Sequence, residues 1–293
     1  MPELPDIDVY VDVLGNTLTG RTLEQVRLGT PFLLRSVEPP LDATFGRRVD
    51  SVRRIGKRIA IGLDDALWLV VHLMIAGRLQ WLDKPPALTA KNRLAAFDFD
   101  HGSLLLTEAG SKKRASLYVA AGDEGLGAHD PGGIEPLQCS FEAFQAALTR
   151  NNHTLKRALT NPRLLSGIGN AYSDEILHAA RLSPVQLTRK LSAAECRRLY
   201  DAMQDTLGHW RERLLAEAGG DLPARVTAFR PEMAVHGRYG LPCPVCGEPV
   251  QRIRYKSNET NYCAACQTGS RILKDRSLSR LLKADWPGTL DEL

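Results

Sequence analysis

The 293-residue sequence has no apolar run approaching the ~18 residues that a membrane-spanning helix needs. Its first residues lack the basic segment and apolar core of a secretory signal. Internal repeats and low-complexity tracts are also missing. With 43% hydrophobic residues, the chain can instead build the cores of about two globular domains, and we expect it in the cytoplasm.

Cysteine is scarce, with six residues in the chain, and four of them form two Cys-x2-Cys pairs. Such pairs fit metal ligation in a reducing compartment better than a disulfide framework. The other two, Cys139 and Cys196, fall in helical patterns, and we expect them to be inert buried thiols.

The paired cysteines are Cys243, Cys246, Cys263 and Cys266, with sixteen residues between the pairs. Four thiolates at this spacing predict one tetrahedral zinc ion; a redox dithiol pair and an iron–sulfur site are the alternatives. Residues 250–255 alternate like a strand, which favours a two-stranded zinc ribbon. Because a site closed by four cysteines is structural, any catalytic groups lie elsewhere.

Basic charge is modest overall, at a net +4, but it is concentrated in segments. Residues 47–58 hold six Arg and Lys against Asp50 alone, and residues 251–283 hold eight against Glu259 and Asp275. Such clusters are the electrostatic footprint of a polyanionic partner, although a solvated charged face explains either cluster equally well. In the second segment Arg254, Lys256 and Arg271 are candidate phosphate contacts.

The chain divides by its hydrophobic period. Residues 4–18 place Leu4, Ile7, Leu14 and other apolar side chains on one helical stripe. From residue 21 to 119 the pattern becomes that of short strands, which predicts a β-sandwich or flattened barrel. The expected strands are 47–55, 58–63, 67–74, 78–82, 94–100 and 103–107.

Residues 120–137 carry seven Gly and Pro in eighteen positions, so we expect no regular element there and place a domain linker in them. Helical periods follow at 141–149, 153–160, 172–180 and 192–217, with a double turn between the second and third. The predicted domains are 1–125 (β-sandwich), 126–235 (helical) and 236–293 (zinc ribbon and tail). The fold class is therefore α+β with several domains.

Pro2 follows the initiator Met, and removal of Met1 would expose a secondary amine. Such an amine condenses with an aldehyde to an iminium, which is the covalent logic of Schiff-base enzymes. The positive end of the following helix lowers the pKa of an amine there, and Glu3 is placed to act as acid or base. The alternative is a proline that merely begins a helix.

Five motifs occur in an order that matches a known family. They are MPELP at 1–5, Gly56-Lys57-Arg58, His72-Leu73 with Gly77-Arg78-Leu79, GIGNAYSDEIL at 167–177, and Val235-His236-Gly237-Arg238 before Cys243. The chain resembles the formamidopyrimidine-DNA glycosylase/endonuclease VIII family of base-excision repair enzymes over nearly its whole length.

The resemblance implies an N-terminal helix and β-sandwich, a helix–two-turn–helix domain and a zinc hairpin, acting as a monomer on damaged DNA in the nucleoid. It implies that Pro2 attacks C1′ of the damaged nucleoside and that Glu3 protonates the sugar oxygen. Lys57 and Asn170 are implied phosphate contacts, with Lys156 a further candidate. The implied reaction is base excision followed by β- and δ-elimination. His72, in an apolar strand, is expected to be a core residue.

Three positions depart from the family pattern. The family's Met that fills the space of a flipped base aligns with Ile75, its Arg-x-Phe wedge is missing from residues 108–116, and its zinc-hairpin Arg is Asn258. Flipping a base from a duplex costs a few kcal/mol. We therefore expect a preference for abasic sites, oxidised pyrimidines, bulges or single strands over 8-oxoguanine paired with cytosine.

Two other functions are open on the sequence. A catalytically silent binder of abasic or bulged DNA would keep the fold and lose the chemistry, as the missing wedge and Asn258 suggest. A tautomerase using an N-terminal proline on small keto acids would have no use for the zinc ribbon, and its substrate binding would be insensitive to salt.

Overall fold

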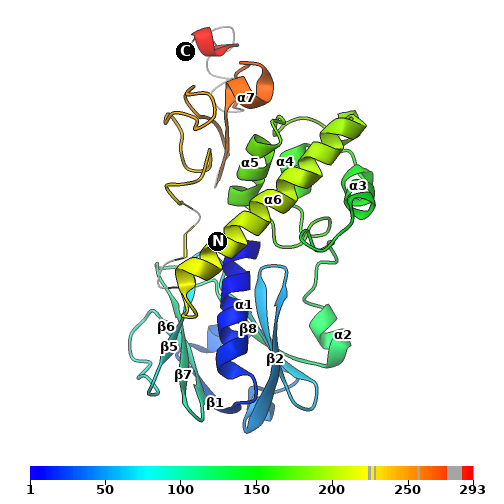
Figure 1. Ribbon diagram of the computed structural model, residues 1–293. Coiled ribbons are helices and arrows are strands. Elements are labelled where there is room, and N and C mark those ends of the chain that lie inside the picture. Colours follow the sequence, from blue (N-terminus) through cyan, green and yellow to red (C-terminus); the bar gives the residue numbers. More distant parts are fainter. Residues whose placement is uncertain (224–225, 228, 256–257, 276–285, 293) are drawn as a thin grey trace. The chain divides into compact units, whose positions relative to one another are not determined.

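A computed structural model describes residues 1–223, 226–227, 229–255, 258–275 and 286–292 (Figure 1). The chain forms two compact units. The first comprises residues 1–131 with 210–227, and the second comprises residues 132–209 with 228–293. Among the described residues, no helix has the length and apolar character required to cross a membrane.

Helix α1 (Leu4–Leu18) opens the first unit, as predicted, with Pro5 in its first turn. Its apolar stripe is buried, with Ile7, Tyr10 and Leu14 fully excluded from solvent. These side chains belong to the main hydrophobic core, so packing of the apolar stripe holds the helix in place.

Eight antiparallel strands follow the order β5-β7-β6-β1-β2-β3-β4-β8. They are β1 (Thr22–Leu28), β2 (Arg47–Ile55), β3 (Arg58–Leu63), β4 (Leu67–His72), β5 (Gly77–Leu82), β6 (Arg93–Phe99), β7 (Gly102–Glu108) and β8 (Ser116–Ala121). The central pair β1–β2 shares only two residue pairs, Thr22 with Arg48 and Leu23 with Arg47. The sheet therefore consists of two four-stranded halves joined at a short junction, and one core holds side chains from both halves and from α1.

The expectation of no regular element in residues 120–137 was wrong for residues 120–127. Strand β8 runs to Ala121, and α2 (Gly122–Gly127) follows at once. Leu126 packs with Ala60, Trp68 and Val70 in a small second cluster on the sheet. Gly122 takes the positive φ of 65° that the sharp turn into this helix requires. Packing of Leu126 against the sheet thus stabilises a short helix in a segment whose glycine-rich composition disfavours one.

The second unit is helical, with α3 (Phe141–Thr149), α4 (Leu155–Leu159), α5 (Asn170–Ala179) and α6 (Ala193–Ala218) close to the predicted positions. From Trp210 onward, α6 belongs to the first unit. Cys196 is buried on α6 as expected, whereas Cys139 precedes α3 and is half-buried. Burial raises the pKa of both thiols.

The zinc ribbon consists of β9 (Gln251–Arg254) and β10 (Glu259–Tyr262), paired antiparallel, followed by the short helix α7 (Ala264–Thr268). Four 3₁₀ turns complete the description: η1 (Pro31–Leu33), η2 (Leu41–Thr44), η3 (Thr188–Lys190) and η5 (Leu290–Glu292). The fold class expected from the sequence is confirmed by this arrangement of a helix-led sheet, a helical domain and a cysteine hairpin.

Candidate functional site

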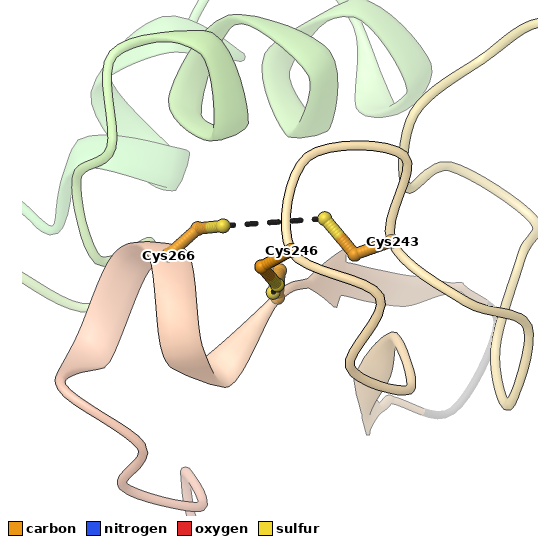
Figure 2. Close-up of side chains that lie close together, drawn as sticks. Cys243, Cys246 and Cys266 are labelled. Carbon is orange, nitrogen blue, oxygen red and sulfur yellow. Dashed lines mark hydrogen bonds between the residues drawn. The ribbon is translucent and has the colours of Figure 1, made fainter.

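The four paired cysteines gather in the second unit, with all their sulfur atoms within 4.8 Å of one another. Cys243 Sγ lies 4.0 Å from Cys266 Sγ, and Cys246 Sγ lies 3.4 Å from Cys263 Sγ. Figure 2 shows Cys243 and Cys266 facing each other, with Cys266 on α7 and Cys243 on the preceding loop. The hairpin and the helix N-terminus together position the cluster.

This donor set fits zinc. A tetrahedron with Zn–S bonds of about 2.3 Å has sulfur–sulfur distances of about 3.8 Å, between the two values found here. His178 on α5 places Nε2 3.2 Å from Cys243 Sγ, which is the kind of outer contact that orients a thiolate ligand. Cys243, Cys246, Cys263 and Cys266 would hold one structural zinc ion and fix the ribbon against α5.

The N-terminal residues of the first unit are buried before the helix begins. Glu3 is the N-cap of α1 and is only 4% exposed. Its backbone N–H donates to Asp6 Oδ2 at 2.9 Å, and the two residues form a capping box. Pro2 is buried beside them. A carboxylate is thus fixed next to the position that a Pro2 amine occupies once Met1 is removed.

Burial of the chain end opposes protonation of an amine there. Burial lowers the pKa of the Met1 amine, with further lowering by Lys57 and Arg78, while Glu3 and Asp6 oppose the change. A terminal amine in this neighbourhood is driven toward its neutral form, which is the nucleophilic one. Met1 itself is 40% exposed, so this first residue is accessible for removal.

Lys57 lies at the tip of the β2–β3 hairpin. Ile55 pairs with Arg58, which leaves Gly56 and Lys57 as a two-residue loop, and Gly56 has a φ of 59°. Arg54 fastens the hairpin to α1, since its Nε donates to Asp8 Oδ1 at 2.7 Å and its Nη1 to Gly56 O at 3.2 Å. The charge of Lys57 contributes to lowering the pKa of the Met1 amine, so this lysine lies close enough to the chain end to affect it electrostatically.

The basic run 47–58 is largely neutralised within the unit. Arg47 pairs with Asp64 and Asp65, and Asp8 accepts from both Arg54 and Arg211. Arg53 covers the ring of Trp68 at 4.9 Å. Most of this cluster is therefore engaged in holding β2, and its charge is less available to a polyanion than its composition suggests.

His72 ends β4 and is partly buried. Burial, followed by the charges of Arg58 and Lys57, lowers its pKa to about 4. The imidazole is neutral at physiological pH. It stands close enough to Lys57 to respond to its charge, although the sequence indicated only a core residue.

The loop at 109–115, where the wedge is missing, is built around the buried Glu108. The Glu108 carboxylate accepts from the N–H groups of Arg114 and Ala115 at 2.8 and 3.0 Å. Lys113 Nζ donates to Glu108 O and Gly110 O. In the β4–β5 connection, Ile75 is 54% exposed, an apolar side chain presented to solvent. The loop is ordered by its own polar groups and presents cations.

In the second unit, Asn170 is the first residue of α5, after Gly167 and Gly169 in the double turn. Its Nδ2 donates to Glu259 O at 2.8 Å, which fastens the helix start to β10. Lys156 Nζ donates to Asn170 O at 2.6 Å and to Asp174 Oδ1 at 2.5 Å. Asp174 is fully buried, and its other oxygen lies 2.8 Å from His236 Nδ1.

The remaining predicted contacts lie on or after the ribbon. Arg254 is exposed on β9, and its backbone N–H donates to Asp275 Oδ2 at 2.6 Å. Arg271 is exposed after α7, with Nε donating to Thr268 O at 3.2 Å. Asn258 is exposed at the hairpin end, and Lys256 lies outside the described residues.

The structure thus assembles the predicted residues in two groups, one in each unit. Pro2, Glu3 and Lys57 gather at the N-terminus of α1, while Asn170 and Lys156 gather at the N-terminus of α5. Three polar partners were missed from the sequence: Arg78, Asp174 and His236. All three lie inside the family motifs named above, so the sequence marked these positions. Their contact partners, which are distant in sequence, are known only from the structure.

Family comparisons agree with this geometry. Residues 1–112 match the formamidopyrimidine-DNA glycosylase N-terminal domain, and residues 133–212 match its H2TH domain. Residues 240–269 match the zinc finger found in FPG and IleRS. The three matches follow the order of the sheet, the helical domain and the cysteine hairpin.

Individual relatives are similar along most of the chain. The formamidopyrimidine-DNA glycosylase of Heliobacterium modesticaldum is 33% identical, covering 91% of this chain and 100% of its own length. The MutM (Fpg) crystal structure from Thermus thermophilus has a TM-score of 0.75 at 30% identity, covering 91% of this chain and 98% of its own. A Lactococcus lactis Fpg complex with abasic-site DNA, with 22% identity and a TM-score of 0.79, shares the fold. The chain belongs to the formamidopyrimidine-DNA glycosylase family of DNA repair proteins.

Proposed function

We propose that this protein is a bifunctional DNA glycosylase and abasic-site lyase that uses the Pro2 amine as its nucleophile. The observation that carries the proposal is the surroundings of the chain end. The N-terminus lies next to a buried, helix-capping Glu3, and burial lowers the pKa of an amine there. Glu3 and Asp6 act to raise this pKa, whereas Lys57 and Arg78 add to the lowering. A chain end that only began a helix would need neither the burial nor the cations.

The chemistry follows from these groups. The Pro2 nitrogen forms a bond to C1′ and releases its proton, while the damaged base leaves with its bonding electrons and takes up a proton in exchange. Glu3 gives a proton to the sugar ring oxygen, which opens the ring and leaves an iminium at C1′. Loss of a C2′ proton then expels the 3′ phosphate, because the iminium accepts the electrons. A second elimination at the 5′ side follows the same logic.

Phosphate binding is assigned to Lys57 in the first unit and Asn170 in the second. Asn170 stands at the N-terminus of α5, where backbone N–H groups attract anions. Lys156 holds the carbonyl of Asn170 and the buried Asp174, so we assign it to positioning Asn170. Arg254, Lys256 and Arg271 are proposed as phosphate contacts from the ribbon and the segment after it.

The proposed substrates are abasic sites, oxidised pyrimidines, bulges and single-stranded lesions. The loop 109–115 presents Lys113 and Arg114 and has no aromatic residue to replace a flipped base. Exposed Ile75 is the apolar side chain available for that space. Single-turnover rates on abasic duplex should exceed those on 8-oxoguanine opposite cytosine, and equal rates would contradict this substrate class.

The decisive experiment traps the iminium. Protein whose N-terminus has been verified by mass is incubated with an abasic-site duplex and borohydride, and the adduct is mapped by peptide mass. An adduct on Pro2 supports the mechanism. Protein that retains Met1 is the matched control, since its Pro2 nitrogen is an amide and forms no iminium.

A silent DNA binder of the same fold is the second candidate. Neutralisation of the basic run 47–58 and the wedge-free loop favour it. Met-free protein that binds abasic DNA tightly and with salt sensitivity, yet gives no adduct, would establish this candidate and end the enzymatic proposal.

A further inference from the structure

The chain continues past the family's zinc finger. The match to that domain ends at residue 269, whereas the sequence continues to residue 293. The Heliobacterium relative is matched over its full length by 91% of this chain, so the chain carries sequence beyond the shared domains. The residues after 269 are therefore a feature of this chain that the family assignment does not explain.

The described parts of this segment fold back on the ribbon. Ile272 N–H donates to Gly288 O at 2.9 Å, and Leu290 N–H donates to Ser270 O at 3.0 Å, so residues 270–272 pair with 288–290. Leu273 N–H donates to the hydroxyl of Tyr262 on β10 at 2.7 Å. Backbone pairing thus holds the two described parts of the extension beside each other, at the red and orange end of the chain in Figure 1, and the Tyr262 hydroxyl ties the first part to β10.

A cavity of about 830 Å³ lies between this extension, α7 and the loop before η3. Its walls include Val185, Gln186, Ile272, Arg271, Lys274 and Trp286. The volume falls in the range of about 300–1,000 Å³ typical of sites for small molecules. All lining residues belong to the second unit, and none of them matches a role in the proposed chemistry at the chain end.

The lining has the chemistry of an anion site with an aromatic wall. Arg271 and Lys274 contribute two cations, and no carboxylate belongs to the described lining. Trp286 Nε1 is shielded from solvent and has no hydrogen-bond acceptor among the described residues, although a buried indole N–H ordinarily finds one. Val185 and Ile272 add apolar surface. Because Nε1 is shielded, the part of Trp286 open to the cavity is the rest of its ring. A ligand that fits this lining carries a planar ring and a negative charge.

We propose that this cavity binds one nucleotide of single-stranded DNA, with the base against Trp286 and its phosphate at Arg271 and Lys274. Bases stack on aromatic side chains irrespective of sequence, and flanking cations hold the backbone. The choice of DNA over a free nucleotide rests on the proposed function. The extension would hold unpaired DNA, such as a strand flanking a bulge or bubble.

The test measures binding of fluorescein-labelled pentathymidylate to the full-length protein by anisotropy at several salt concentrations. Trp286→Ala should weaken binding about tenfold or more, because stacking of a base is lost. Trp286→Phe keeps a ring and should lose less. Lys274→Gln should reduce the slope of log K against log salt by about 0.7, the value for one phosphate of a single strand. Lys84→Gln, on an exposed residue of the first unit, is the charge-matched control and should change neither quantity.

Wild-type affinity in both Trp286→Ala and Lys274→Gln would overturn the inference. An affinity for thymidine 5′-phosphate equal to that for pentathymidylate would overturn the assignment to single strands. If pentaglutamate displaced the labelled probe as well as unlabelled pentathymidylate does, the site would be one for an acidic peptide instead. Zinc content verifies that each variant keeps its ribbon. If Trp286→Ala loses its zinc, the affinities of Trp286→Phe and Lys274→Gln test the inference in its place.

Iminium trapping on wild-type protein is run in parallel. Trapping without pentathymidylate binding would refute this inference alone, whereas binding without trapping would refute only the proposed function.

Discussion

The two units build their polar sites by different means. At the N-terminus of α1, the chain end is buried among charges, and Glu3 is fixed by one capping interaction. At the N-terminus of α5, a fully buried Asp174 is paired with Lys156 and His236, and a nearby cysteine cluster fixes the ribbon. The first arrangement favours chemistry on a group whose protonation is adjustable. The second favours a rigid surface.

This contrast has a thermodynamic side. Removing one member of a buried ion pair leaves an uncompensated charge, which costs about 3–5 kcal/mol. The groups at the chain end, under the proposed function, serve catalysis more than folding. Substitutions in the second unit should therefore mainly lower the free energy of unfolding. Substitutions at the chain end should mainly lower the rate of DNA cleavage. Four experiments sharpen or break this division.

The largest effect is expected for the zinc cluster. Cys243→Ser should abolish binding of one zinc ion, whose affinity in zinc-finger peptides corresponds to about 10 kcal/mol or more at neutral pH. Hydrogen exchange should show loss of protection in β9, β10 and α7, while β2 to β4 stay protected. Cys139→Ser, at a half-buried thiol that donates to Pro136 O, is the control and should keep zinc. Full zinc content and an ordered ribbon in Cys243→Ser would contradict the metal assignment.

Glu3→Gln tests the chain end. The amide keeps an oxygen that can accept a hydrogen bond at the N-cap, so folding should change little, whereas loss of a general acid lowers rates by about 10²–10⁴-fold. Single-turnover cleavage of abasic duplex provides the measurement, with DNA affinity determined in parallel. Asp12→Asn, an exposed acid on the same helix, should leave both unchanged. Equal losses in the two variants would mean that Glu3 acts only through bulk charge.

Lys156→Met tests the buried pair. The free energy of unfolding of the second unit should fall by about 3 kcal/mol or more, because Asp174 loses a partner at 2.5 Å. Denaturant unfolding followed through hydrogen exchange of α5 measures this. If Lys156 only positions Asn170, the salt dependence of DNA binding should be unchanged. A drop of about 0.9 in its slope would instead assign Lys156 a phosphate contact.

The smallest effect is expected from His72. Its pKa is lowered from an ordinary 6.5 to about 4 in the folded chain, so between these values the unfolded chain binds a proton that the folded chain does not. Stability from this group is complete above about pH 6.5, falls as the pH drops toward 4, and changes no further below that. The full loss should be about 3 kcal/mol, at 1.36 kcal/mol for each pH unit.

Denaturant midpoints from pH 7 to 4 check this prediction. His72→Gln should have a shallower pH dependence than the native chain, and the difference between the two curves cancels the other titrating groups. Parallel curves would show that the pKa of His72 is the same in the folded and the unfolded chain, which would contradict the lowering.

Local features of the fold follow from the amino-acid sequence alone. The β2–β3 hairpin was predicted at its observed bounds, because Gly56 supplies the positive φ that a two-residue loop needs. Helix α1 followed from its apolar period, and the zinc cluster followed from the spacing of four cysteines, since chelation depends on residues close in sequence. The family motifs placed Pro2, Glu3, Lys57 and Asn170 as candidates.

Tertiary structure decided what side chains far apart in sequence do to one another. Only the fold pairs Arg54 and Arg211 with Asp8, which separates structural cations from those open to DNA. Only the fold brings His236 to Asp174 and packs Leu126 of α2 against the sheet within a glycine-rich stretch. The physical reason is that a side chain's charge, burial and hydrogen bonds depend on neighbours brought by chain folding, which local propensity and spacing do not encode.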